Sequence, residues 1–139
     1  MLDIFEILGP VMVGPSSSHT AGAVRIGRMA RTLLDGVPVW AEIGLYGSFA
    51  ETGRGHGTDR ALVAGLLGMA PDDLDVPRSF EIAAERGLAF SFHTVQLRTA
   101  HPNTAVLDVT AEDGHRLVLR AASTGGGRIR VEQVNGVNV

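Results

Sequence analysis

The sequence predicts an α+β fold, in which helices pack on one face of a mixed, largely antiparallel sheet. Two observations support this class. In the first half of the chain, apolar residues recur at the three-and-four spacing of an amphipathic helix, as at residues 26, 29, 30, 33 and 34. After Gly87 the apolar spacing changes to two, which is typical of half-buried strands. The expected order of elements is α-β-α-α-β-β-β-β.

The first part of the chain predicts a helix, a strand and a loop. An apolar segment at residues 1–13 is expected to form a short helix or strand. The helix that follows is expected at residues 18–34, with Ser17 or Ser18 as its N-cap and Gly36 as its stop. The β-branched and aromatic residues at 39–46 predict a strand, and four glycines at 47–57 predict a loop.

The second part predicts two further helices and four strands. Thr58 is the expected cap of a helix near residues 59–67, and another helix is expected at residues 77–86, stopped by Gly87. The strands are expected at residues 88–97, 105–111, 116–122 and 128–134. The dipeptide Asp113-Gly114 predicts a hairpin turn between the middle pair.

Composition limits the classes of partner. The 139 residues are 45% hydrophobic and 19% charged, and we expect residues 1–139 to form one domain. A net charge of −3 argues against a nucleic-acid partner, and no apolar run has the length of a membrane span. Because the first residues are acidic rather than basic and the chain lacks cysteine, the expected compartment is the cytoplasm.

A run of polar residues leads into the first expected helix. It consists of Ser16, Ser17, Ser18, His19 and Thr20. Unpaired backbone N–H groups and the helix dipole favour an anion at such a position, so the run predicts a site for a carboxylate or phosphate. The alternative is a polar capping loop, for which one serine would suffice. Arg25, Arg28 and Arg31 recur at every third residue and are expected to form a solvated face, although Arg25 lies near enough to the helix start to reach an anion.

Histidines provide the other candidate groups. His56 lies between two glycines just before an expected helix, which leaves its imidazole unshielded for proton transfer. The alternative is a loop histidine facing water. His101 and Asn103 flank a proline at a strand entrance, where a turn alone would explain them. His93 and His115 are expected to be structural. The histidines lack metal-ligand spacing with carboxylates, and we expect no metal on this chain.

Five segments resemble one family. Residues 7–20 (ILGPVMVGPSSSHT) are similar, almost letter for letter, to the opening of the β chain of iron–sulfur-dependent L-serine dehydratases. Later blocks of that family resemble YGSFAET at 46–52, GHGTD at 55–59, HPNTA at 101–105 and GGG at 125–127. A small departure is Ala23, where many members carry proline. The segments span nearly the whole chain in order, so the resemblance is specific.

The resemblance implies a fold and a set of site residues. The fold would be similar to the intervening, substrate-binding domain of one class of phosphoglycerate dehydrogenases. An ACT-type regulatory domain usually follows in the family, and this chain stops at Val139, about where that domain would begin. His56 would be the base for the α-proton, and His19 would have a site role. That role could be to bind the substrate carboxylate, to carry a proton or to fix the loop. The implied substrate-binding residues are Ser16, Ser17, Ser18, Thr20, Thr58 and Asn103.

The implied reaction converts L-serine to pyruvate and ammonia. In the family a [4Fe–4S] cluster, held by cysteines of a separate α subunit, acts as a Lewis acid on the serine hydroxyl. The present chain has no cysteine to hold such a cluster and no lysine for a pyridoxal phosphate Schiff base, so we expect it to depend on that partner. A homodimer is left open. The alternative is a regulatory domain that binds a serine-like or phosphorylated effector and performs no chemistry.

Overall fold

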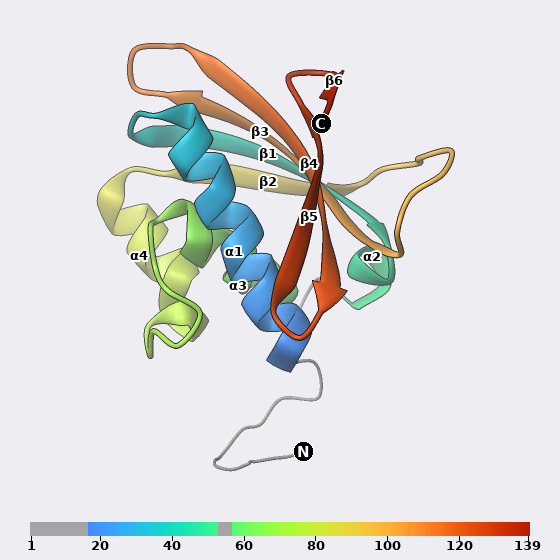
Figure 1. The fold of residues 1–139 in the computed structure, drawn as a ribbon. Helices are drawn as coiled ribbons and strands as arrows, with labels where there is room; N and C mark the ends of the chain where they lie inside the picture. Colours follow the sequence, from blue (N-terminus) through green and yellow to red (C-terminus); the bar gives the residue numbers. More distant parts are fainter. Residues whose placement is uncertain (1–16, 53–56) are drawn as a thin grey trace.

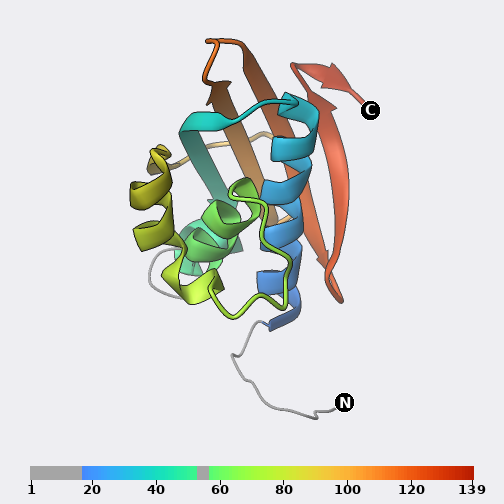
Figure 2. The same ribbon diagram turned by 90° about the vertical axis from the view of Figure 1, so that its left-hand side faces the viewer.

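Residues 17–52 and 57–139 are described by the computed structural model, and they form two layers (Figure 1). One layer is a sheet with the strand order β2-β1-β3-β4-β5-β6. The other consists of α1, α3 and α4, which lie on one face of this sheet (Figure 2). Among the described strands, β1 and β2 are the one parallel pair. The predicted α+β class with a mixed, largely antiparallel sheet is confirmed.

The predicted elements within the described residues are present. The helices are α1 (Ser17–Leu34), α2 (Ser48–Thr52), α3 (Thr58–Leu66) and α4 (Ser79–Arg86), with the 3₁₀ turn η1 (Val76–Arg78) before α4. The strands are β1 (Pro38–Gly47), β2 (Ala89–Thr94), β3 (Asn103–Ala111), β4 (Arg116–Gly125), β5 (Arg128–Val134) and β6 (Val137–Asn138). The turn at Asp113-Gly114 joins β3 to β4, as predicted. The element expected at residues 1–13 lies outside the described residues.

Three local expectations were wrong. The short helix α2 falls within the stretch expected to be a loop. The loop was expected because the five residues of α2 follow directly on Gly47 in a glycine-rich context. Strand β2 ends at Thr94 rather than at residue 97, because its pairing with β1 stops there, opposite Leu45. The two-residue strand β6 was not expected, since it is too short to show a periodicity.

The ends of α1 also differ from expectation. The helix begins at Ser17, so both Ser17 and Ser18 belong to its first turn and neither is the N-cap. At the other end, Asp35 rather than Gly36 takes the left-handed conformation, with φ of 52°. A short polar side chain tolerates this conformation better than most, which is why a glycine is not required there.

Helices α1 and α3 cross at very short distance because glycines meet at the crossing. A Cβ atom on Gly65 would lie 2.1 Å from the carbonyl oxygen of Val24, and one on Gly27 would lie 2.3 Å from that of Leu62. Helix α1 packs on alternate residues of the sheet, such as Leu107 of β3 and Leu119 of β4, whose side chains are fully buried. The core therefore lies between α1, α3 and the centre of the sheet.

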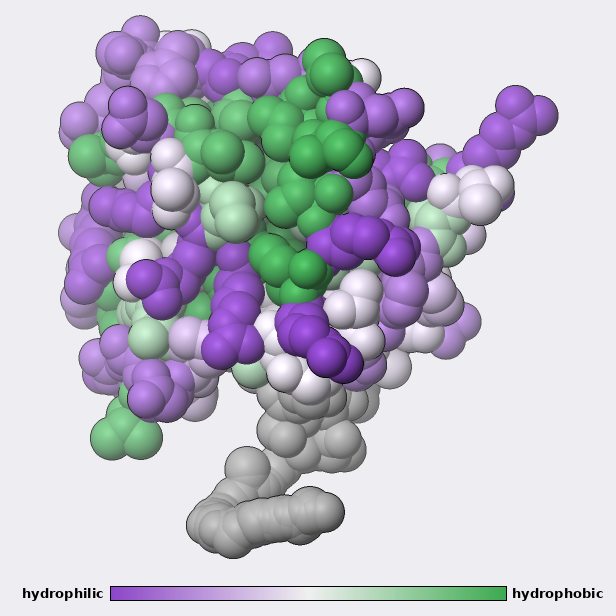
Figure 3. Space-filling view, in the orientation of Figure 1, coloured by the Kyte–Doolittle hydropathy of each residue, from purple (hydrophilic) through white to green (hydrophobic). Residues whose placement is uncertain are grey.

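The opposite face of the sheet is polar. Residues that alternate with the core residues form ion pairs there, with 3.0 Å between Glu42 and His93 and 3.0 Å between Arg120 and Glu132. Apolar side chains instead reach the surface along α1 and the neighbouring β5 (Figure 3), where Leu33 is 41% exposed. Among the described helices, none has the length and apolar character to span a membrane.

Candidate functional site

A polar pocket of about 220 Å³ lies where four elements begin. The residues that line it are His19, Ser48, Phe49, Thr52, Thr58 and Asn103. They come from the first turns of α1 and α3, from α2 and from the first residue of β3. Except for the phenyl ring, every lining side chain is an uncharged hydrogen-bonding group or an imidazole. Such a pocket suits a small polar molecule.

His19 is held through both ring nitrogens. Its Nδ1 atom lies 2.9 Å from Oγ of Ser123, which is fully buried on β4. Its Nε2 atom lies 3.4 Å from the amide Nδ2 of Asn103. These contacts fix the plane of the half-buried imidazole at the edge of the pocket.

Asn103 owes its position to a turn that His101 organises. The backbone N–H of Asn103 donates to Nδ1 of His101, at 3.0 Å. The hydroxyl of Thr104 donates to the carbonyl oxygen of His101, at 2.7 Å. The sequence did not decide whether His101 and Asn103 belong to a turn or to a site. In the structure the ring of His101 stabilises the turn, whereas the side chain of Asn103 lines the pocket.

Thr58 lines the pocket as the first residue of α3. It is not the cap of this helix, contrary to the sequence expectation, because Gly57 occupies the N-cap position with φ of 99°. Residues with a Cβ atom rarely adopt that conformation, so the cap position favours glycine. Thr58 is therefore the first residue of the helix rather than its cap. Thr58 is 5% exposed at the wall of the pocket.

The sequence did not nominate Ser48, Phe49, Thr52 or Ser123. The spacing of Ser48 and Thr52 places them one turn apart on α2, where the Thr52 hydroxyl donates to the Ser48 carbonyl at 2.8 Å. That spacing was a usable signal, but the surrounding glycines favoured a loop. Ser123 carries no local signal, because its proximity to His19 arises from the packing of α1 on β4.

The structure brings together three of the residues predicted from the sequence: His19, Thr58 and Asn103. Thr20 follows His19 on α1, half-buried, and is not one of the lining residues. His56 and Ser16 lie outside the described residues, and so do the side chains of Ser17 and Ser18. In the described part of the chain, no group of three histidine or acidic side chains is placed to hold a metal ion.

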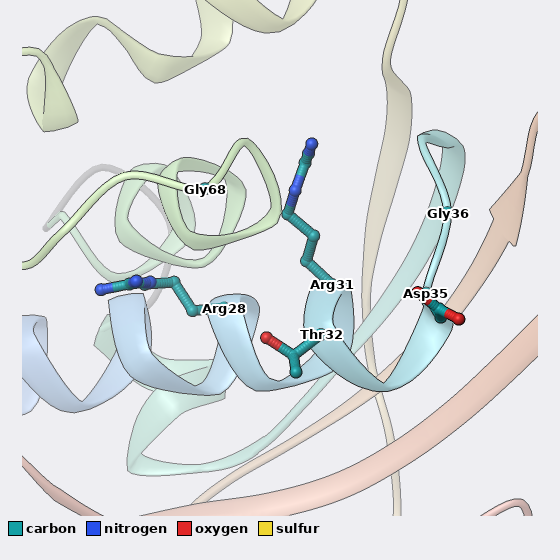
Figure 4. Close-up of a pocket in the computed structure, with 6 residues that line it drawn as sticks. All are labelled: Arg28, Arg31, Thr32, Asp35, Gly36 and Gly68. Carbon is teal, nitrogen blue, oxygen red and sulfur yellow. The ribbon is translucent and has the colours of Figure 1, made fainter.

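A second hollow, of about 450 Å³, lies at the other end of α1 (Figure 4). Arg31 points from α1 toward the turn at Gly68, whereas Arg28 extends along the helix. The Nη1 atom of Arg31 donates to the carbonyl oxygen of Leu66 at 2.9 Å, at the end of α3. Arg25 likewise donates to a carbonyl, that of Gly127. Arg25 and Arg28 are exposed, as expected for a solvated face, whereas Arg31 is half-buried. The carbonyl end of α3 disfavours an anion in this hollow.

Comparison with known proteins points to one family. The family model "Serine dehydratase beta chain" matches residues 1–87. The chain is 46% identical to the probable L-serine dehydratase β chain of Bacillus subtilis (strain 168) over 133 residues, which is 96% of this chain and 60% of that protein. It is 43% identical to the L-serine dehydratase β chain of Peptoniphilus asaccharolyticus over 136 residues, which is 97% of this chain and 61% of that protein. The chain thus spans about 60% of the length of these relatives.

Proposed function

We propose, because the chain belongs to the serine dehydratase β-chain family, that it is the component of an L-serine ammonia-lyase that binds L-serine. The observation that carries the proposal is the pocket around His19, with its neutral donors and acceptors and its volume of about 220 Å³. An amino acid presents an ammonium group, a carboxylate and, in serine, a hydroxyl, and each needs a hydrogen-bonding partner when it is desolvated. Similarity to dehydratase β chains does not favour the purely regulatory alternative.

The roles proposed for the residues follow from their chemistry. Ser16, Ser17, Ser18 and Thr20, with the backbone N–H groups that begin α1, are proposed to bind the carboxylate. Asn103 and Thr58 are proposed to contact the rest of the substrate. His56 is proposed to remove the α-proton. Loss of that proton from Cα and of hydroxide from Cβ leaves an enamine, whose hydrolysis gives pyruvate and ammonia.

A partner subunit is part of the proposal. The family resemblance implies a [4Fe–4S] cluster, and thiolates are the ligands that hold such clusters. The donor set of this chain does not fit, since its 139 residues include no cysteine. We therefore propose that an α subunit holds the cluster.

The test is reconstitution. We expect anaerobic co-expression with a cysteine-bearing α chain to yield an enzyme that forms pyruvate from L-serine. In that enzyme, Asn103→Ala should raise KM roughly ten- to hundredfold, the equivalent of one hydrogen bond to a charged group. Asn138→Ala, at an exposed residue of β6, is the matched control and should leave KM unchanged. An unchanged KM for Asn103→Ala would contradict the proposal that the substrate binds in this pocket.

A further inference from the structure

Ser123 is a fully buried hydroxyl that the proposed reaction does not use. Its Oγ atom lies 2.9 Å from Nδ1 of His19, on the side of the ring away from Asn103. A buried hydroxyl without a hydrogen bond is costly, so this contact is the natural reason for a serine among the apolar residues of β4.

The contacts of the two ring nitrogens of His19 select one tautomer. The side-chain nitrogen of Asn103 can only donate, so Nε2 of His19 must accept and carries no proton. In a neutral imidazole the proton then lies on Nδ1, which donates it to Oγ of Ser123. The opposite tautomer would direct two donors at one another across the gap between His19 and Asn103.

The backbone of α1 holds Ser123 in place. A Cβ atom on Gly22 would lie 2.3 Å from Oγ of Ser123 and 2.9 Å from its Cβ. The helix therefore passes directly over this hydroxyl, and Gly22 stands one turn after His19 on the same face. With no room to shift, Ser123 presents a fixed acceptor to the ring.

We propose that Ser123 is a positioning residue: its Oγ atom accepts from Nδ1–H in the tautomer that Asn103 selects, and so holds the ring with the lone pair of Nε2 at the edge of the pocket. Because Nε2 has one lone pair, the ammonium or hydroxyl group of L-serine then takes the place of the Asn103 amide as its donor, and His19 does not donate to the carboxylate. The identity of that ligand rests on the proposed function, whereas the tautomer does not. The proposal selects between the roles that the sequence left open for His19.

The experiment reads the tautomer directly, on the full chain without substrate or partner. Ring ¹⁵N NMR spectra of the ¹⁵N-histidine-labelled protein are recorded at about pH 8, where an ordinary imidazole is neutral. The signals of His19 are identified by their loss in His19→Gln. We expect a protonated Nδ1 and an unprotonated Nε2. In Ser123→Ala the Nδ1–H group lacks its acceptor while the Asn103 donor still faces Nε2, so the preference for a protonated Nδ1 should weaken without reversing.

Two further variants make the test decisive. Ser79→Ala removes another fully buried serine, whose hydroxyl donates to the Arg60 carbonyl at 2.6 Å, and should leave the signals of His19 unchanged. Asn103→Asp replaces the donor facing Nε2 with an acceptor and should bring a proton to Nε2, so it carries the test if Ser123→Ala does not fold.

Three results would overturn the proposal: a protonated Nε2 in the parent, parent-like signals in Ser123→Ala, or an equal shift in Ser79→Ala. Failure of the reconstituted enzyme to form pyruvate, with the expected tautomer present, would instead contradict the proposed function alone.

Discussion

His115 connects the β3–β4 turn to the end of α1 through both of its ring nitrogens. Its Nε2 atom lies 2.6 Å from the carbonyl oxygen of Leu34, and its Nδ1 atom contacts the carboxylate of Asp113. Both partners are acceptors, so a doubly protonated ring satisfies both. The hydrogen bond to the Leu34 carbonyl, followed by that to Asp113, raises the pKa of His115. A positive charge also suits the carbonyl end of a helix.

We predict that the contribution of His115 to stability depends on pH. Because its pKa is raised in the folded state, its stabilisation is complete below the unfolded pKa of about 6.5 and is lost as pH rises through the folded pKa. Thermal unfolding of the parent and of His115→Ala should therefore differ most near pH 6 and least near pH 9. An equal difference at both pH values would contradict the charged state. His93→Ala, at another ion-paired histidine, is the comparison variant.

A second prediction at this scale concerns His56. If it removes the α-proton, His56→Ala in the reconstituted enzyme should lose roughly 10²–10⁴ in kcat, the usual contribution of a positioned base. KM should change much less, because the loss belongs to the transition state. A large rise in KM with kcat nearly intact would indicate an anchoring role. If His19→Ala then abolished turnover, the base would be His19.

The sequence could nominate individual site residues but not their contacts. His19 and Asn103 are 84 residues apart, and each stood out because of its local motif. The hydroxyl that completes the group, Ser123, lies in a strand whose periodicity shows only burial. Its role arises from the close packing of α1 over β4 at Gly22, which no local pattern records.

At the scale of elements, the crossing of α1 and α3 requires glycine. An added Cβ at Gly65 would meet the backbone oxygen of Val24 at 2.1 Å, and a backbone atom cannot rotate away. We predict that Gly65→Ala destabilises the protein by about 1–3 kcal/mol, the range for overpacked cores, although alanine favours the helix itself. Urea unfolding measures the change. Glu85→Ala, at an exposed site of α4, should stay within about 0.5 kcal/mol of the parent, and an equally small effect of Gly65→Ala would contradict the close crossing.

Most of the elements were predictable because each keeps its apolar spacing over a long enough segment to be recognised. Helix α1 and strand β5 have the bounds that apolar spacing predicts, within a residue. Strand β2 ends early because its pairing with β1 stops at Thr94, although the apolar residues Val95 and Leu97 follow it at a spacing of two. Local sequence describes what a segment can do, whereas pairing with the neighbouring strand decides where it ends.

At the scale of the whole molecule, we predict that the chain cannot act alone. Without cysteine or lysine it can hold neither a cluster by thiolates nor a pyridoxal Schiff base. The purified chain, supplied with iron and sulfide or with pyridoxal phosphate, should form no pyruvate from L-serine. Pyruvate formation by this chain without a partner would contradict the division of labour proposed here. The α chain purified alone and treated in the same way is the parallel control.

The strand order has a consequence for how the protein reaches its fold. Strands β3, β4, β5 and β6 follow one another through short turns. Strands β1 and β2 also pair, but α2, α3 and α4 separate them along the chain. Closing a long loop costs chain entropy before its contacts form, so the meander should assemble first and β2 should join last. In native-state hydrogen exchange, amides of β2 bonded to β1 should open at lower free energy than those joining β3 to β4. Equal protection of both sets would mean that the sheet forms and opens as a single cooperative unit.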